Sequence, residues 1–402
     1  MEVNIASPIA FLTRLKNRFK STPTAEHSAH SDAKPNAMRD ETDDPTPPQV
    51  EKIPSDDGER LNRTLLVHHP SCENHEIPFH CESPLRTFSI KRALFETFPD
   101  LSVRVASEAT SEQLELFHTA AHISRTMEIF EIVRRTGEIF QIDPDTGIGK
   151  NSIDSVMFAA GAACTAVDEI FAGRFKNCFC CVRPPGHHAT PSHSMGFCTF
   201  NNVGIAAMWA QHKYDVEKVA VVDFDVHHGN GTQEKFQTSP NCFFASSHVG
   251  FGFYPGTGKE WERGVDDNVV NVPLRPGSGP FEFKAAYEGK ILPALREFGP
   301  GMIFISAGFD AHKDDPVGEM ELTEEDFGWV TKEICKVAEE VCEGRVVSVL
   351  EGGYDIDAIV ASAKAHVRAL MESPEPAFEG GNLGLDVAAK NILEEFAGLK
   401  ID

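Results

Sequence analysis

Short, almost entirely apolar runs constrain the fold of this chain more than any other feature of its sequence. They cover residues 178–182, 219–224, 242–245, 302–306 and 346–350. Such runs are typical of parallel strands that are buried on both faces. Helical patterns separate them, and they predict a single α/β domain with a central, mostly parallel multi-stranded sheet covered by helices on both faces.

The helical patterns lie within 151–171, after Asn202 and after Thr323. In the last of these, Asp326 stands three residues after Thr323, which is the spacing of a capping box. We therefore expect a helix to begin directly after Thr323, with its apolar side on the sheet.

The remainder of the chain predicts four segments. Residues 1–20 form a basic amphipathic segment, and 21–60 are so rich in Pro, Ser, Thr and acidic residues that we expect a disordered linker. The folded domain covers 61–375, and 376–402 form a C-terminal extension that we expect to be helical. No apolar run reaches the roughly 18 to 20 residues that a membrane-spanning helix needs, so we expect no membrane span.

The N-terminal segment bears on where the protein acts. Ser7 and Pro8 resemble the start of a helix with apolar and basic residues at helical spacing. An organelle presequence, a membrane-surface helix and a tail without a role are all open interpretations. We expect an intracellular protein of the nucleus or cytoplasm, with the mitochondrion or plastid also possible.

The net charge limits the classes of binding partner, and the cysteine content indicates the redox compartment. A formal net charge of −24 argues against direct nucleic-acid binding and favours cationic partners, although solubility alone would also explain it. The ten cysteines lack the dense, even spacing of a secreted disulfide framework, so we expect buried thiols in a reducing compartment. The sequence leaves the oligomeric state open.

Polar residues follow four of the predicted strands, in the segments 183–188, 223–230, 308–310 and 351–354. The carboxyl ends of parallel strands form the ligand crevice of an open α/β sheet, so these distant segments should converge. Asp225 and His227, two residues apart, and Asp310 can then face one point. Two carboxylates and one imidazole suit a catalytic metal ion, whereas each residue alone could equally make a cap or core hydrogen bond.

Two further groups could carry proton transfer and oxyanion stabilisation. His187 and His188 follow a rigid Pro-Pro-Gly turn and could supply a general base and a general acid. Asp223 and Asn230 could orient these rings through a carboxylate and an amide oxygen, which would give them unlike basicity. Tyr354 follows two glycines, and its hydroxyl could donate to a developing oxyanion, although it could also be an ordinary packed Tyr.

These segments, together with 196–198, resemble the zinc-dependent histone deacetylase family in their order and sequence, over about residues 62–370. Asn230 and the run around it are similar to the second class of that family. The resemblance implies an arginase/deacetylase-like fold and one Zn²⁺ per chain. It also implies that Asp225, His227 and Asp310 bind the zinc, that His187 and His188 form the acid/base pair, and that Tyr354 polarises the carbonyl.

The resemblance further implies a narrow tunnel for the acyl-lysine chain. Its expected lining residues are Gly196, Phe197, Tyr254, Val317 and Gly353. Tyr254 stands where Phe is common in the family, which adds a polar group to the rim. A structural K⁺ is expected beside Asp223, with an oxygen from Ser246.

The resemblance implies hydrolysis of the acetyl amide on lysine side chains of histone or non-histone proteins and peptides. Acetylpolyamine deacetylation is a competing interpretation, but Val317 stands where polyamine-selective relatives carry a recognition Glu. A binuclear manganese hydrolase of the arginase type would need a second set of Asp and His ligands that the sequence lacks. A non-catalytic acyl-lysine binding or corepressor module is also open.

Overall fold

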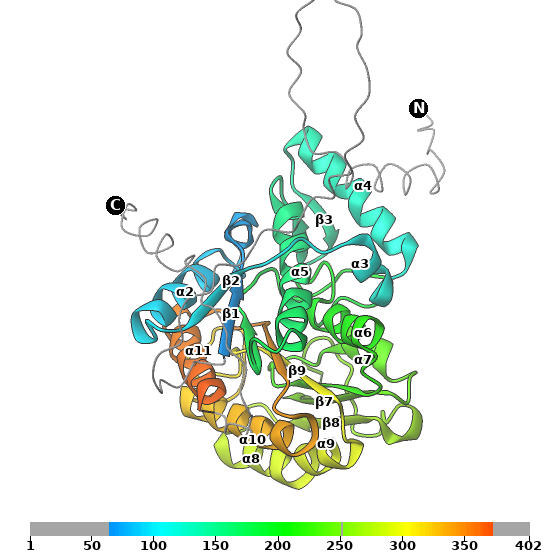
Figure 1. The fold of residues 1–402 in the computed structure, drawn as a ribbon. Coiled ribbons are helices and arrows are strands. Elements are labelled where there is room, and N and C mark those ends of the chain that lie inside the picture. The colour runs from blue at the N-terminus through cyan, green and yellow to red at the C-terminus, as the bar shows by residue number, and fades with distance from the viewer. Residues whose placement is uncertain (1–63, 251, 373–402) are drawn as a thin grey trace, which may run out of the picture. The chain divides into compact units, whose positions relative to one another are not determined.

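A fully parallel eight-stranded sheet forms the centre of the fold, as the sequence predicts (Figure 1). The computed structural model describes residues 64–250 and 252–372. In order across the sheet, the strands are β2 (Ser102–Val105), β1 (Thr64–His68), β5 (Asn177–Cys180), β10 (Val346–Leu350), β9 (Met302–Ala307), β6 (Val219–Asp223), β7 (Cys242–Val249) and β8 (Val269–Leu274).

Helices cover both faces of this sheet (Figure 1). On one face, α5 (Ser152–Phe171) and α6 (Asn202–Tyr214) pack on the central strands. On the other face lie α2 (Leu85–Thr97), α10 (Glu324–Cys342) and α11 (Ile356–Met371). The other elements are η1 (Pro70–Asn74), α3 (Ser111–Phe117), α4 (Ala120–Thr136), β3 (Phe140–Asp143), β4 (Thr146–Ile148), α7 (Asn230–Phe236), η2 (Val265–Asp267), α8 (Pro280–Ala286), η3 (Tyr287–Ile291) and α9 (Leu292–Phe298).

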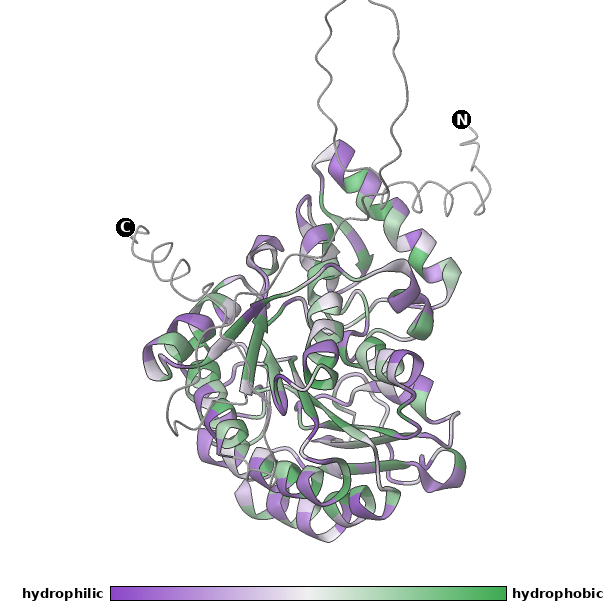
Figure 2. Cartoon of the chain, in the orientation of Figure 1, coloured by the Kyte–Doolittle hydropathy of each residue, from purple (hydrophilic) through white to green (hydrophobic). Residues whose placement is uncertain are grey.

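The core lies between the sheet and these helices. Every residue of β6, β9 and β10 is buried, which explains why these strands read as continuous apolar runs rather than alternating ones. Figure 2 shows the apolar strands in the interior and the polar sides of the helices facing outward. In α10, Phe327, Val330 and Ile334 are buried at helical spacing, as the amphipathic pattern predicts.

The strand and helix starts agree closely with the sequence prediction. The capping box at Thr323 and Asp326 is present, and α10 begins at Glu324. The strand predicted at 178–182 begins one residue earlier and ends at Cys180. Strands β1, β2 and β8 were not predicted. Arg104 interrupts the apolar run of β2, and Asn271 and Pro273 interrupt that of β8.

Several predictions concern residues outside the described ranges, namely the segment 1–20, the linker 21–60 and the extension 376–402. Within the described ranges, no helix combines the length and apolar character needed to cross a membrane. The cysteines are free thiols there, and all except Cys81 are buried as expected.

One buried histidine links the sheet to α10 and α11. His366 on α11 lies 2.6 Å from Thr331 Oγ1 through its Nδ1 and 2.8 Å from Ser348 Oγ through its Nε2. Thr331 donates its own hydroxyl proton to the carbonyl of Phe327, so His366 Nδ1 donates and its Nε2 accepts. Burial lowers the pKa of His366 from 6.5 to about 3, which keeps the ring neutral in the folded protein.

This shift predicts that acid destabilises the fold. Below about pH 6.5 the unfolded chain binds a proton at residue 366 that the folded protein rejects, so the free energy of unfolding falls as the pH falls. From pH 7 to pH 5, His366 alone should remove about 2 kcal/mol. In His366→Gln, denaturant unfolding at both pH values should give lower stability at pH 7 but a pH-dependent loss smaller by about that amount. Equal losses in the two proteins would contradict this assignment.

Candidate active site

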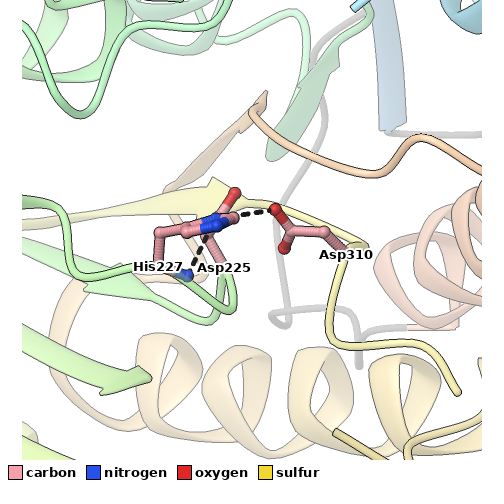
Figure 3. A group of neighbouring side chains, drawn as sticks. All are labelled: Asp225, His227 and Asp310. Carbon is pink, nitrogen blue, oxygen red and sulfur yellow. Dashed lines mark hydrogen bonds and ion pairs between the residues drawn. The ribbon is translucent and has the colours of Figure 1, made fainter. Parts of the chain in front are cut away.

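The four polar segments converge at the carboxyl edge of the sheet, as their positions after parallel strands predict. Asp225 and His227 follow β6, and Asp310 follows β9, the strand that pairs with it. These three side chains are buried and their donor atoms lie within 4.8 Å of one another. Figure 3 shows the imidazole of His227 facing both carboxylates.

The distances within this group are short. His227 Nδ1 lies 3.1 Å from Asp225 Oδ1 and 3.1 Å from Asp310 Oδ2. Donors that each bind one tetrahedral ion at about 2.0 to 2.2 Å are separated by about 3.4 Å, so the observed spacing fits a single small cation. The donor set of two carboxylates and one imidazole also leaves coordination positions for water or substrate, which is typical of catalytic rather than structural metal sites.

The remaining carboxylate oxygens of this group accept backbone hydrogen bonds. Asp225 Oδ2 accepts from the amide of Gly352 at 2.8 Å, and Asp310 Oδ1 accepts from the amide of Val226 at 2.8 Å. A Cβ at position 352 would overlap Asp310 Oδ2, so only glycine permits this approach. The two carboxylates are therefore fixed by backbone amides of neighbouring strand ends, independently of a metal.

Two buried carboxylates so close together require positive charge. Burial and the charge of Asp225 raise the pKa of Asp310 to about 7. Burial opposes charge on His227, but its hydrogen bonds to Asp225 and Asp310 outweigh that effect and raise its pKa to about 10. The group thus has the electrostatics of a cation site.

His187 is held by carboxylates at both its ring and its backbone. Its Nδ1 donates to Asp223 Oδ2 at 2.9 Å. Its amide and that of Gly186 donate to Glu351 Oε2 at 3.1 and 2.7 Å. Burial disfavours charge on the ring, but Asp225, Asp223 and Glu351 outweigh burial and hold the pKa of His187 above its ordinary value.

His188 has an uncharged partner instead. Its Nδ1 lies 2.8 Å from Asn230 Oδ1, while the Asn230 amide nitrogen faces the sulfur of Met195. Because the amide oxygen only accepts, Nδ1 carries the proton and Nε2 keeps its lone pair. Burial and the neighbouring charges of His187 and His227 hold the pKa of His188 well below its ordinary value. The two adjacent rings therefore differ in basicity, because carboxylates surround His187 whereas His188 is buried beside the rings of His187 and His227.

Tyr354 follows the glycine pair and has two buried charged neighbours. Arg86 of α2 donates to the carbonyls of Glu351 and Gly353 and lies 5.0 Å from the centre of the Tyr354 ring. Asp315 accepts from the Tyr354 amide at 2.6 Å. Burial and the charge of Asp310 raise the pKa of the Tyr354 phenol, so it keeps its proton and remains a donor at neutral pH.

The expected tunnel residues contact different groups of this site. Phe197 has a left-handed backbone (φ 67°) and contacts the Tyr354 ring edge-to-face at 5.9 Å. Tyr254 contacts the rings of His188 and His227 at 5.1 and 6.1 Å and is 37% exposed. Val317 is partly buried and donates its amide to Asp315.

The backbone of the Phe197 turn is held by the β3–β4 hairpin. Asp145 Oδ1 accepts from the amide of Gly196 at 3.1 Å, and Thr146 Oγ1 accepts from the amide of Phe197 at 3.0 Å. Gly196 also has positive φ, and a Cβ there would overlap the His188 ring. The hairpin therefore stabilises a backbone conformation that Phe rarely adopts. Gly353, the other tunnel glycine, also has positive φ (115°).

The side chains expected near a potassium ion have contacts within the protein. Asp223 Oδ1 accepts from the amide of Asp225 at 3.1 Å, and Ser246 Oγ lies 2.8 Å from His248 Nδ1. Asp223 and Ser246 are partners in the register of β6 and β7, so they do lie side by side. The potassium ion stays a prediction.

Sequence reasoning missed several residues around the site. Glu82 accepts from both Arg86 and Arg183, and these arginines are fully buried. Phe253 stacks on the His227 ring at 5.1 Å, and His80 contacts Phe197 at 4.4 Å. Glu82 and Arg86 are four residues apart at the start of α2, and this spacing alone is a weak sequence signal for a buried ion pair.

Comparison with known proteins agrees with this geometry. Residues 80–370 match the family model described as "Histone deacetylase domain". The chain is 36% identical to "Histone deacetylase 15" of Arabidopsis thaliana over 337 residues, which cover 79% of this chain and 58% of that protein. It is also 36% identical to "Histone deacetylase 10, chloroplastic" of Oryza sativa subsp. japonica over 283 residues, covering 68% of this chain and 64% of the relative.

A relative in Dictyostelium discoideum, "Type-2 histone deacetylase 2", is 33% identical over 80% of this chain, but the match spans only 21% of that longer protein. The chain thus spans less than two thirds of each of these curated relatives. Among solved structures, the "Crystal Structure of HDA15 HD domain" superimposes with a TM-score of 0.72 at 34% identity. That match covers 79% of this chain and 91% of the other.

The donor geometry predicts about one divalent metal ion per chain. Removing the ion with a chelator should lower the unfolding temperature, because two buried carboxylates lose their counter-charge. Elemental analysis after dialysis should give a stoichiometry near zero for Asp310→Ala. Asp314→Ala, which changes an exposed side chain in the same loop, should retain the metal. Full metal content in Asp310→Ala would rule out this ligand set.

Proposed function

Because the chain belongs to the histone deacetylase family, we propose that it hydrolyses the acetyl amide on lysine side chains and releases acetate. The observation that carries this proposal is the meeting of three groups at one sheet edge. These groups are a buried donor set of two carboxylates and an imidazole, two histidines with unlike partners, and a protonated phenol. Together they contain every group that metal-assisted amide hydrolysis requires.

We propose that Asp225, His227 and Asp310 hold a zinc ion. When bound, zinc polarises the amide carbonyl and lowers the pKa of water towards neutrality. The backbone contacts of Asp225 and Asp310 keep both carboxylates in the binding geometry. A potassium ion near Asp223 and Ser246 is a further part of the proposal.

His188 is the proposed general base. Its Nδ1 proton is committed to Asn230, so Nε2 can accept a proton from the attacking water. The proton then passes to the nitrogen of the departing lysine amine, which returns His188 to its neutral starting state. His187, paired with Asp223, carries positive charge and donates from Nε2 towards the reacting oxygen.

Tyr354 is the proposed donor to the amide oxygen. Its high pKa keeps the hydroxyl protonated, and negative charge develops on that oxygen only as the tetrahedral species forms. The interaction therefore strengthens in the transition state and should act mainly on kcat.

We propose that Phe197 and Tyr254, with Gly196, Val317 and Gly353, line the passage for the acyl-lysine side chain. Aromatic side chains on two sides of the metal donors suit a flexible chain of methylene groups. Acetylated histone or non-histone proteins and peptides are the proposed substrates.

We further propose that the protein acts inside the cell. Relatives from rice and Arabidopsis are named as chloroplastic proteins, and a targeting sequence is one interpretation of the basic, amphipathic N-terminal segment of this chain. Sequencing the N-terminus of the native protein would test whether that segment is removed.

Tyr354→Phe should lower kcat for an acetyl-lysine peptide by roughly 100- to 1000-fold, because one oxyanion donor is lost while the ring remains. KM and zinc content should change little. Acetate release measured over a range of peptide concentrations would separate the two kinetic constants.

Tyr214→Phe is the matched control, because its hydroxyl contacts Asp168 far from the metal donors. It should retain wild-type turnover. An acetylpolyamine should be a poorer substrate than the peptide. If the zinc-loaded wild-type protein binds acetyl peptide without releasing acetate, the hydrolase proposal is wrong and a binding role replaces it.

A further inference from the structure

The Asp315 carboxylate accepts hydrogen bonds from the backbone amides of two loops. The proposed chemistry does not use this residue. It is 7% exposed. Its Oδ1 accepts from the amides of Val317 and Gly318 at 2.9 and 3.2 Å. Its Oδ2 accepts from the amides of Tyr354 and Asp355 at 2.6 and 3.3 Å. One carboxylate thus joins the loop after β9 to the loop after β10.

The two loops that Asp315 joins each carry a functional group. The loop after β9 begins with Asp310, a proposed metal ligand, and its turn folds back on that residue. A Cβ at Gly318 would overlap the carbonyl oxygen of Asp310, so the turn contacts the ligand's backbone directly. The loop after β10 carries Tyr354.

The backbone of the Tyr354 loop needs restraint by hydrogen bonds because of its sequence. Gly352 and Gly353 precede the tyrosine, and glycine restricts the backbone less than any other residue. Arg86 holds the carbonyl groups of this turn, at Glu351 and Gly353. Asp315 holds the amide of Tyr354 itself and connects it to the loop of a metal ligand.

We propose that Asp315 is a positioning residue that fixes the Tyr354 hydroxyl relative to the metal site by accepting hydrogen bonds from both loops. The proposal rests on the function proposed above and deepens it. Asp315 does not reach the reacting atoms. Its effect on turnover passes through Tyr354.

Asp315→Asn removes the charge at nearly constant size. An amide has one acceptor oxygen, so in either orientation its NH₂ group faces one pair of backbone amides. The side chain then holds one loop and repels the other, and Tyr354 should move or become mobile. Since a displacement of about 1 Å at a reacting group costs about 100-fold, we expect kcat to fall about 10- to 100-fold, with KM and zinc content little changed.

Asp314→Asn is the matched control: the same chemical change at the adjacent residue, whose side chain is 63% exposed. It should keep wild-type kcat. Thermal unfolding of both variants would identify any general loss of the fold.

A double-mutant cycle distinguishes positioning from a general structural role. In the Tyr354→Phe background, Asp315→Asn should lower kcat by less than about threefold, because the group it positions is already absent. Multiplicative effects of the two substitutions would overturn the proposal.

A second readout does not depend on activity. The chain contains four tyrosines, so the protein labelled with 3-fluorotyrosine should give four ¹⁹F resonances, with Tyr354 identified by its loss in Tyr354→Phe. Asp315→Asn should shift or broaden the Tyr354 resonance and leave those of Tyr214 and Tyr287 unchanged. An unchanged Tyr354 resonance would refute the positioning role. If the wild-type protein proved inactive, this experiment would still decide the role of Asp315.

Discussion

Buried carboxylates at one edge of a parallel sheet are the constraint on which the rest of the site depends. Asp223, Asp225, Asp310 and Glu351 are all fully buried there. A buried charge without partners is strongly unfavourable, so each carboxylate must be surrounded by donors. The carboxyl ends of neighbouring strands supply these donors, because the chain leaves regular strand pairing there and its amides become available. The fold thus provides both the charges and the groups that compensate them.

Each of these carboxylates has different hydrogen-bond donors around it, and its chemical role differs accordingly. Asp223 contacts an imidazole, and Glu351 binds the backbone of the same histidine segment. Asp225 and Asp310 share one imidazole between them, which leaves a deficit of positive charge that a metal ion can meet. His188 has the uncharged amide of Asn230 as its partner, and burial beside His187 and His227 makes it the less basic ring. Different surroundings therefore give unlike pKa values to two adjacent histidines that share a turn.

The sequence predicted the parts of this arrangement that come from strand ends. Continuous apolar runs located β6, β9 and β10, and the polar residues after them could be assigned to one edge because parallel strands end together. Glu82, Arg86 and Asp145 could not be found in this way, since they come from a loop, a helix start and a small hairpin that have no fixed relation to the sheet before folding. Asp315 could not be predicted from the sequence for another reason. Its partners are backbone amides, which every residue but proline carries, so no pattern of side chains marks it.

Close packing around the metal donors explains why such residues are needed. Glycine at position 352 is required because any side chain there would overlap Asp310, yet a Gly-Gly pair leaves the following tyrosine poorly restrained. Restraint must then come from outside the turn. Arg86 donates to the carbonyl of Gly353 and Asp315 accepts from the amide of Tyr354, so opposite charges hold the two ends of the peptide between these residues. Both charged residues are buried, where such contacts are strongest and where water cannot replace them. The backbone of the glycine turn before Tyr354 is thereby fixed by two buried charged residues, Arg86 and Asp315.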